Sequence, residues 1–512
     1  MTNLKSLLRL HKNGKTTFQF HRSLGWIREH QSSEGGIQVS SVNENMYPEV
    51  TGYFIPSLIN WGEIELAQQF GKALIEVQQK DGSFLDSGST TKCVFDTGQI
   101  IRGLYALYKE TNDKKYLDAL IQAIDWINST IEIDGRVTAP DVEVWGGVIP
   151  IGILLYSLEP ALRISKVLNL KEEKLELAIE RLLKDENLEK FTSVSHFHAY
   201  IIEALVDLGQ IERAKKALYP MLNKRKFRNW IPGKPNHKWV CSTAMFQYAV
   251  VCYKIGLDTE GNQLFLSATK LQNRSGGWYG SYGWVAKIFS PLGRVNSYFG
   301  MYFPRTEIPW AIKYFLDALN LRLMNNFNLV ADTFSDYIDS EDGRLELVLG
   351  MIEELKPRSV LDLGCGKGRY LQHISQRFPD IDVFACDVSS KVTESLSKVV
   401  EVKTGSLVKT PYKDQEFDFI FTIEALEHSV NVEASLKELN RILAPQGSLL
   451  IIDKNSSKLG RLELPDWEQW FDVEKLSLEL EKMGFKTIIY PNVAYENRND
   501  GLFFGLTGKK NG

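Results

Sequence analysis

The sequence predicts two domains of different class, an all-α domain followed by an α/β domain. The chain has 512 residues, more than one hydrophobic core usually supports. A glycine-containing turn recurs in the first three hundred residues, between stretches of helical periodicity. At residues 358–368 the pattern changes to an apolar strand that runs into a glycine-rich loop. We therefore expect domains at residues 1–325 and 335–512, joined near residues 325–340.

The recurring turns read Gln-x-x-x-Gly, followed by a small and an apolar residue. They begin at Gln31, Gln78 and Gln272, which are about one and four units of roughly 48 residues apart. Apolar residues recur at spacings of three and four in 100–109, 116–128, 199–208 and 243–255, which predicts helices. Six helix pairs of this kind predict an (α/α)6 toroid.

These turns are similar to those of the terpenoid cyclase and prenyltransferase toroids. The overall pattern is also similar to toroids of glycan-active proteins, such as unsaturated glucuronyl hydrolases and uronyl epimerases. The sequence has no Asp-x-Asp-Asp motif for protonating a polyene, which argues against a cyclase. Cys241 has no evident zinc-binding partners by spacing, which argues against a prenyltransferase.

Several expected helix starts of the first domain place acids or imidazoles beside aromatic residues. Aromatic faces can cover a sugar ring while carboxylates and imidazoles bind its hydroxyls. Glu49 and Asp96 are candidates for an acid and base pair in glycosidic or lyase chemistry. Helix capping and core packing are the alternatives. The candidate substrate residues are Tyr47, Glu49, Tyr53, Asp96, Gln99, Glu143, Trp145, His196, His198 and Trp278.

His196 and His198 are two residues apart and would share one face of a strand. With a third ligand they could bind a metal. No carboxylate lies at a suitable spacing, so hydrogen-bonded pocket residues are the favoured interpretation and no metal site is predicted.

The second domain opens with an apolar strand at 360–363 and glycines at 364, 366 and 368. Asp362 precedes the loop, and Asp387 closes a second strand at 383–386. A dinucleotide fold has G-x-G-x-x-G and cradles a pyrophosphate, whereas this loop reads G-x-G-x-G. Acidic side chains, together with a glycine loop whose backbone a ligand can approach closely, suit a ligand with an ammonium group and a ribose.

This loop resembles motif I of the class I S-adenosylmethionine (SAM) methyltransferases. Residues 407–421 resemble the segment that closes over adenine and leads into strand four. The sequence IEALEH at 423–428 is similar to the EVLEH signature of the methyltransferase 11 type, and residues 441–447 match its R-x-L-x-P-G-G turn. Ser406 replaces a common aspartate and Gln446 a glycine. The resemblance implies a Rossmann-like, seven-stranded mixed sheet and SAM as cofactor.

The resemblance also assigns roles to residues. Asp362 would hold the amino acid end of SAM, and Asp387 would bind both ribose hydroxyls. His428 or Glu427, just after strand four, would be the catalytic base. Helix capping or packing is the alternative for His428. The cofactor-binding candidates are Asp362, Gly364, Cys365, Gly366, Gly368, Asp387, Val388, Ser406, Leu407 and Glu424.

The remaining elements of this domain follow in order. A leading helix is expected at 343–354, a fifth strand at 448–453 and a helix at 473–483. Two apolar runs at 486–490 and 502–507 then predict a terminal antiparallel pair of strands.

Composition excludes several classes of protein. The net charge is −4 and the longest basic cluster, at 224–228, is short, so we do not expect a nucleic acid partner. The five cysteines are scattered without a C-x-x-C spacing, which favours the reduced cytoplasm over a disulfide framework. No signal peptide and no apolar run long enough for a transmembrane helix is evident. The oligomeric state is not indicated.

Together these features suggest a SAM-dependent O-methyltransferase that acts on a saccharide or glycoconjugate held by the toroid. Tethering would raise the local concentration of the acceptor. The alternatives are a bifunctional protein whose toroid is a glycan lyase, hydrolase or epimerase, a noncatalytic scaffold, and a methyltransferase for a lipophilic small molecule.

Overall fold

The structure is a computed structural model that describes residues 11–145, 149–225, 229–283, 286–290, 293–297, 300–397 and 400–511. The chain divides into two compact units. The helical unit comprises Arg22–Ile59 and Glu63–Arg322, and the α/β unit comprises Met1–His21, Asn60–Gly62 and Leu323–Gly512. Residues 11–21 and 60–62 thus belong to the α/β unit, although the sequence suggested a first domain of residues 1–325.

A seven-stranded sheet forms the centre of the α/β unit. Its strand order is β10-β9-β8-β11-β12-β15-β14, with the first five strands parallel and β15 antiparallel to both neighbours. The predicted mixed sheet of seven strands is therefore confirmed. The strands are β8 (Ser359–Leu363), β9 (Asp382–Asp387), β10 (Glu401–Thr404), β11 (Phe417–Ile423), β12 (Leu443–Lys454), β14 (Phe485–Tyr495) and β15 (Arg498–Lys510).

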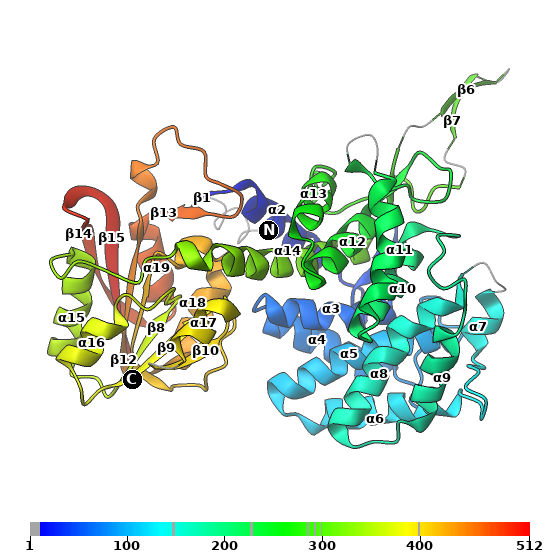
Figure 1. Cartoon of the computed structure of the whole chain (residues 1–512), viewed down its shortest axis with the longest axis horizontal. Coiled ribbons are helices and arrows are strands. Elements are labelled where there is room, and N and C mark those ends of the chain that lie inside the picture. Colours follow the sequence, from blue (N-terminus) through cyan, green and yellow to red (C-terminus); the bar gives the residue numbers. More distant parts are fainter. Residues whose placement is uncertain are drawn as a thin grey trace. The chain divides into compact units, whose positions relative to one another are not determined.

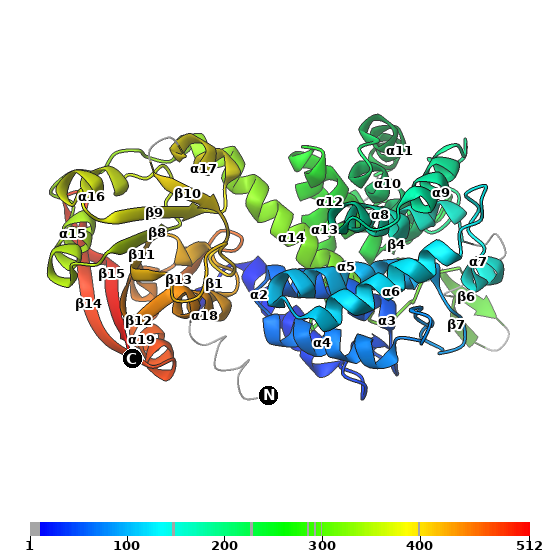
Figure 2. The same ribbon diagram turned by 90° about the horizontal axis from the view of Figure 1, so that it is seen from below.

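Helices cover both faces of this sheet, as Figure 2 shows. One face packs against α15 (Gly343–Leu355), α16 (Leu371–Arg377) and α17 (Ser390–Leu396), and the other against α18 (Val432–Ile442) and α19 (Val473–Lys482). Val360 belongs to the first core, whereas Leu361 and Leu363 belong to the second. This alternation along β8 explains why the strand reads as a continuous apolar run.

Short segments from early in the chain complete the α/β unit. Strand β1 (His11–Asn13) pairs antiparallel with β13 (Gln469–Phe471). The Thr17 hydroxyl donates to the carbonyl of Trp467 at 2.8 Å, and the Asn431 amide donates to the carbonyl of Trp61 at 2.8 Å. The short 3-10 helices of this unit are η3 (Ala331–Thr333), η4 (Leu426–His428) and η5 (Ser456–Lys458).

The helical unit consists mainly of consecutive helix pairs (Figure 1). The pairs are α3 (Pro48–Asn60) with α4 (Ile64–Val77), α5 (Val94–Thr111) with α6 (Lys114–Ser129), α8 (Leu155–Leu168) with α9 (Glu173–Leu183), α10 (Ser195–Asp207) with α11 (Ile211–Asn223), and α12 (Ser242–Lys254) with α13 (Asp258–Thr269). The helices predicted at 100–109, 116–128, 199–208 and 243–255 correspond to α5, α6, α10 and α12.

Other elements connect these pairs. Helix α2 (Lys15–Glu29) precedes them, and α14 (Pro309–Val330) follows, with the division between the two units inside it. The short elements are β2 (Gln38–Ser40), β3 (Asn43–Met46), α7 (Pro140–Trp145), η1 (Ile151–Leu154), β4 (Val240–Cys241), β5 (Ser281–Tyr282), β6 (Ala286–Ser290) and β7 (Gly293–Ser297).

The first helices of successive pairs pack closely on one another. A Cβ at Gly52 of α3 would lie 2.6 Å from the Cα of Ile100 in α5, and a Cβ at Gly98 of α5 would lie 2.4 Å from the Cβ of Ser157 in α8. Helix α8 contacts α10, and α10 contacts α12. Only glycine permits the two closest approaches.

Contacts of α14 continue this series. Phe246 of α12 and Phe315 of α14 have ring centroids 5.6 Å apart. The hydroxyl of Ser57 in α3 donates to the carboxylate of Asp317 in α14. Each of these helices therefore contacts the first helix of the preceding and following pair, and α14 also contacts α3.

In two of the three repeated turns, the structure explains why glutamine and glycine are present. The side-chain amide of Gln78 donates to the carbonyl of Gly82 at 3.1 Å, and that of Gln272 donates to the carbonyl of Gly276 at 3.0 Å. Both glycines have positive φ, +90° and +106°. The glutamine therefore closes a turn that only glycine adopts without strain.

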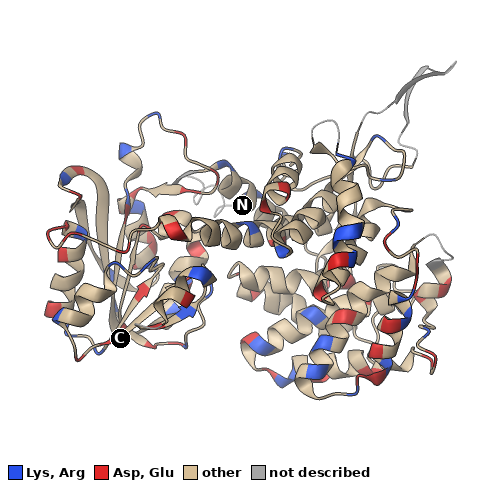
Figure 3. Ribbon diagram, viewed as in Figure 1, with Lys and Arg blue, Asp and Glu red and all other residues tan. Residues whose placement is uncertain are grey.

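The charged residues and the cysteines are placed as the composition suggests, with mixed charges and no disulfides among the five cysteines. Figure 3 shows acidic and basic residues interleaved along the ribbons in this view. All five cysteines are buried free thiols. Among the described residues, no helix is both long enough and apolar enough to cross a membrane.

Candidate functional site

The glycine loop after β8 approaches its neighbours too closely for larger residues. Gly364, Gly366 and Gly368 all have positive φ, of +84°, +49° and +74°. A Cβ at Gly364 would lie 2.4 Å from the Cβ of Ala425. The amides of Gly364 and Cys365 both donate to the carbonyl of Cys386, at 2.8 and 3.1 Å. These two hydrogen bonds fix the loop to β9, and its glycines present backbone atoms without side chains.

Asp387 lies at the end of β9 and holds the loop from the other side. Its Oδ2 accepts from the amide of Gly366 at 3.0 Å, and its Oδ1 accepts from the amide of Ser389 at 2.9 Å. Burial raises the pKa of this carboxyl, although the backbone amides act in the opposite direction. Each carboxylate oxygen has more than one acceptor site, so ligand hydroxyls can still bind.

Asp362 is the most unusual group of the site. Its side chain is 2% exposed, and Oδ2 has no hydrogen-bond partner among the described residues. Burial raises its pKa to about 8, Arg369 lowers it and Asp387 raises it further. A buried carboxyl without a partner is costly, and a ligand ammonium would supply the missing partner. The residues present therefore fit the amino acid end of SAM.

The other expected cofactor residues surround this loop. Cys365 packs with Leu371, and Leu407 lies 3.9 Å from the position of a Gly364 Cβ. Ser406 exchanges two backbone hydrogen bonds with Lys409, both 3.1 Å, which makes a tight turn beyond β10. Val388 is half-buried directly after Asp387.

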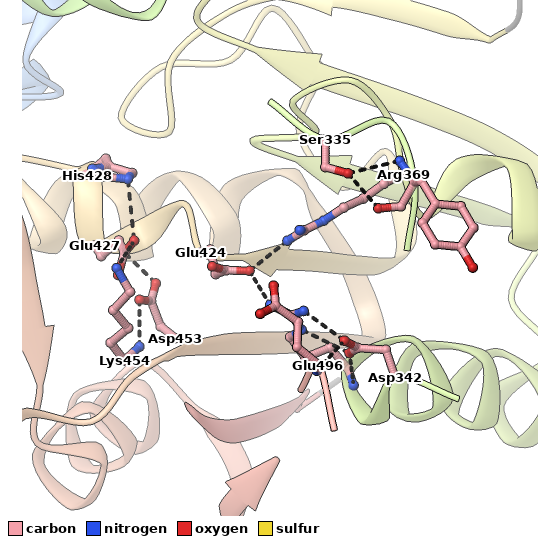
Figure 4. Close-up of polar contacts among 11 residues, drawn as sticks. Ser335, Asp342, Arg369, Glu424, Glu427, His428, Asp453, Lys454 and Glu496 are labelled. Carbon is pink, nitrogen blue, oxygen red and sulfur yellow. Dashed lines mark hydrogen bonds and ion pairs between the residues drawn. The ribbon is translucent and has the colours of Figure 1, made fainter. Parts of the chain in front are cut away.

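Glu424 is held by two arginines that the sequence analysis missed. Its Oε1 accepts from Nη2 of Arg369 at 2.6 Å (Figure 4) and from Nη1 of Arg344, also at 2.6 Å. The backbone of Glu424 has φ +53°, a strained value that this clamp helps to hold. Arg369 directly follows the last glycine, so the glycine motif could have indicated it. Arg344 lies on α15, far from the motif in sequence, and no local pattern indicates it.

The segment after α14 was interpreted from sequence as a junction, but it lies over the glycine loop. The ring of Phe334 is 3.7 Å from the position of a Gly366 Cβ. Lys367 donates to the carbonyl of Asp332 at 2.8 Å, and Lys391 forms an ion pair with the Asp332 carboxylate. Residues 331–334 thus form part of the wall of the site.

Glu427 and His428 follow β11 in a polar network with two residues of β12 (Figure 4), in which Glu427 is buried and the His428 ring is partly exposed. His428 Nε2 lies 3.4 Å from Glu427 Oε1, and Lys454 Nζ lies 3.0 Å from the same oxygen. The Glu427 amide donates to Asp453 at 3.0 Å. Burial raises the pKa of Glu427 to about 7, while burial and the Glu427 charge raise that of Asp453.

Burial lowers the pKa of His428 to about 4, so its imidazole is neutral at neutral pH. The ring of Phe327 lies 5.5 Å from that of His428, and Trp467 lies 6.4 Å from Phe327. A neutral imidazole beside a carboxyl and an aromatic ring is a suitable place for an acceptor whose proton must be removed.

In the helical unit, five of the candidate substrate residues come together. Tyr47 is hydrogen-bonded to Glu49, and the charges of Glu49 and Asp96 both raise its pKa after burial. Tyr53 is hydrogen-bonded to Tyr200, whose ring lies 4.5 Å from that of His196. Tyr302 and Trp310 join them. We call this group the carboxyl–aromatic cluster: Tyr47, Glu49, Tyr53, Asp96, His196, Tyr200, Tyr302 and Trp310.

The other candidates of this unit lie elsewhere. Trp278 is fully buried against Phe246 and Phe315 and donates to a backbone carbonyl, so it is a core residue. Glu143 is exposed, and the side chain of Trp145 lies outside the described residues. Gln99 is buried and donates to the carbonyl of Tyr156 at 3.1 Å.

The two histidines lie on helix α10 and not on a strand, and each has its own hydrogen-bond partners. His196 contacts Gln247 at 2.7 Å. His198 contacts the Tyr248 hydroxyl at 2.9 Å and the carbonyl of Glu189 at 3.1 Å. Helical geometry directs residues two apart to different sides, which explains their separate partners.

Comparison with known proteins identifies the α/β unit. Residues 361–451 match the family model described as "Methyltransferase domain". An uncharacterized protein of Methanocaldococcus jannaschii is 28% identical over 184 residues, which are 36% of this chain and 78% of that protein. A probable tRNA methyltransferase 9B of Bos taurus is 33% identical over 139 residues, 26% of this chain and 30% of that one.

Other curated relatives are named as N- and O-methyltransferases, and the matches cover 36–37% of their length. The solved structure of a SAM-dependent methyltransferase from Aquifex aeolicus is 26% identical, covers 36% of this chain and 95% of its own, and has a TM-score of 0.27. The C-terminal part of the chain thus contains a SAM-dependent methyltransferase domain, and its cofactor is SAM.

Proposed function

We propose that this protein transfers the methyl group of SAM to a hydroxyl of a saccharide or glycoconjugate. Asp362 carries the cofactor part of the proposal, since its buried and unpartnered carboxylate oxygen fits the ammonium of SAM. Asp387 would bind the ribose hydroxyls. SAM supplies an activated methyl group when bound, so the protein must position the acceptor and remove its proton.

His428 is the proposed base. Its neutral imidazole can accept a proton, and the neighbouring Glu427 would stabilise the imidazolium that forms. Lys454 in turn holds Glu427 at 3.0 Å. Phe327, 5.5 Å from His428, offers an apolar surface on which a sugar ring could stack.

The helical unit would hold the acceptor inside a closed ring of six helices, five of which are the first members of helix pairs. Successive contacts among α3, α5, α8, α10, α12 and α14, together with the Ser57 to Asp317 hydrogen bond from α3 to α14, support an (α/α)6 toroid. The names of the relatives include N-, O- and tRNA methyltransferases and favour no sugar. The carboxyl–aromatic cluster is the observation that favours a saccharide.

The test is transfer of a labelled methyl group from SAM by the full chain. Panels of oligosaccharides, transfer RNA and small amines would be offered separately. We expect label in the oligosaccharides, stable to mild base as an ether is. Label only in transfer RNA or amines, or none in any acceptor, would contradict the proposal.

The cluster also supports a second candidate function, in which the helical unit itself modifies a glycan. Glu49 and Asp96 are both buried, and the Glu49 charge raises the pKa of Asp96; two carboxyls are what such chemistry requires. Turnover of an oligosaccharide without SAM, lost in Glu49→Gln, would establish it.

Replacing His428 by glutamine should separate catalysis from cofactor binding. We expect methyl transfer to fall about 100-fold or more, the usual contribution of a general base. SAM affinity should remain within threefold, because the cofactor contacts come from other residues. Phe327→Leu is a control for the aromatic wall and should raise KM more than it lowers kcat. Equal rates in His428→Gln and wild type would exclude the histidine as base.

His428 should stay neutral well below the usual histidine range. Burial favours the uncharged ring, although Glu468 and Glu424 act in the opposite direction and Lys454 in the same one. NMR of ¹³C-labelled histidine across pH 3–8 should show a midpoint near 4 for His428. Its signal can be assigned by its loss in His428→Gln. A midpoint near 6.5 would show instead that solvent reaches the ring freely.

A further inference from the structure

The carboxyl–aromatic cluster gathers residues from the starts of several helices. Glu49 lies in the first turn of α3, Asp96 in that of α5, His196 in that of α10 and Trp310 in that of α14. Helices α3, α5 and α10 are first members of helix pairs, and α14 contacts α3 and α12. Ring and charge contacts among these residues show that the first turns of the four helices lie together.

Several polar atoms in and beside the cluster lack partners. Glu49 Oε1, Trp310 Nε1 and Gln247 Nε2 are buried and make no hydrogen bond of normal geometry within the described part of the chain, although Tyr47 interacts with the Glu49 carboxyl and Trp310 with the Tyr302 hydroxyl. The residues are 4%, 4% and 0% exposed. A buried polar atom without a partner loses its hydrogen bonds to water and destabilises the fold. A ligand that supplies partners would explain why they are retained.

The two carboxyl groups of the cluster narrow the class of ligand that it can bind. Burial raises the pKa of Glu49 to about 7, and burial followed by the Glu49 charge raises that of Asp96. Glu49 is therefore partly protonated at neutral pH and can donate as well as accept a hydrogen bond.

An organic cation is disfavoured because an internal cation already occupies two aromatic faces. Lys313 Nζ lies 4.8 Å from the ring centre of Tyr53 and 3.9 Å from that of Tyr314, and it pairs with Asp317 at 2.9 Å. A second cation nearby would be repelled. A neutral ring with several hydroxyls can use both the donors and the acceptors.

His196 adds an acceptor of defined orientation. Burial lowers its pKa to about 4, so the ring is neutral at neutral pH. Nδ1 lies 2.7 Å from Oε1 of Gln247 and donates to it, which leaves Nε2 as an acceptor for a ligand hydroxyl.

We propose that the carboxyl–aromatic cluster is a binding site for one neutral sugar ring. Glu49 and Asp96 exchange hydrogen bonds with its hydroxyls, Trp310 donates from Nε1, and His196 accepts. This assignment deepens the proposed function by naming the residues that hold the saccharide, and it does not depend on SAM.

The first experiment measures sugar binding by the full chain without SAM. The probes are an array of neutral and acidic mono- and oligosaccharides, and choline in solution. We expect neutral sugars to bind, with at least tenfold weaker binding in Glu49→Gln, Asp96→Asn and Trp310→Phe. Glu159→Gln is the matched control, because this buried glutamate of α8 lies outside the cluster and forms ion pairs with Arg163 at 2.7 Å and Arg102 at 3.7 Å. It should keep the sugar affinity.

The second experiment uses the ligand-free protein and does not require the right sugar. Thermal unfolding of Glu49→Gln should occur at the wild-type temperature or higher, because a buried carboxyl that has one unpartnered oxygen and no close ion pair among the described residues becomes a neutral amide. Glu159→Gln should unfold earlier, because Arg102 and Arg163 lose a charged partner. A decrease in Glu49→Gln as large as that in Glu159→Gln would assign a structural role to Glu49 and overturn the proposal.

Binding of no neutral sugar, binding of choline or acidic sugars alone, or unchanged binding in Glu49→Gln would also overturn it. Sugar binding with no methyl transfer would leave this site intact and contradict only the proposed function.

Discussion

Asp387→Ala should abolish measurable SAM binding by the full chain. The wild-type carboxylate accepts hydrogen bonds from the backbone amides of Gly366 and Ser389, so it fixes the glycine loop, and it would also bind the ribose. Hydrogen bonds to a charged group contribute about 1.5–3 kcal/mol each, and 1.4 kcal/mol is tenfold in affinity. We therefore expect at least about a 100-fold loss, measured by calorimetry.

Two controls make this result specific. Asp382→Ala changes an exposed acid at the other end of the same strand and should leave SAM affinity unchanged. Circular dichroism should show that Asp387→Ala is folded, since removing a buried carboxyl with a raised pKa also removes a desolvation cost. Affinity within threefold of wild type would mean that Asp387 does not contact the cofactor.

Local patterns predicted much of the α/β unit. The strand at 360–363 and the positive-φ glycines follow from rules that act over a few residues. The same holds for the repeated turns, where Gln78 and Gln272 each close a loop onto a glycine four residues away. Such features require no knowledge of distant contacts.

Long-range pairing accounts for what the sequence did not predict. Arg344 and Glu424 are 80 residues apart, and nothing in either segment indicates the other. Strand β1 has three residues and pairs with β13, more than 450 positions later, so its periodicity carries no signal. Trp278 shows the opposite error: its turn resembled a ligand-binding loop, but its ring completes an aromatic core.

Arg344→Met should strongly destabilise the α/β unit. The guanidinium is 3% exposed and donates twice to Asp342, at 2.9 and 2.8 Å, and once to Glu424 at 2.6 Å. Breaking a buried ion pair by removing one partner costs about 3–5 kcal/mol, because the remaining charge is left without compensation. Methionine roughly preserves the apolar contacts with Tyr495 and Phe503.

Hydrogen exchange of the amides of β8 and β12 is the appropriate measurement, because it reports on this unit alone when the two units unfold separately. Arg358→Met, which removes an exposed partner of Asp418, should change little.

Burial raises the pKa of Asp342, but the hydrogen bonds and charge of Arg344 outweigh it and lower the value below normal. The stabilisation is therefore present above about pH 4 and is lost as pH falls through the folded-state pKa. Wild type and Arg344→Met should accordingly converge in acid, and a difference that persists at pH 2 would point to lost packing instead of a lost ion pair.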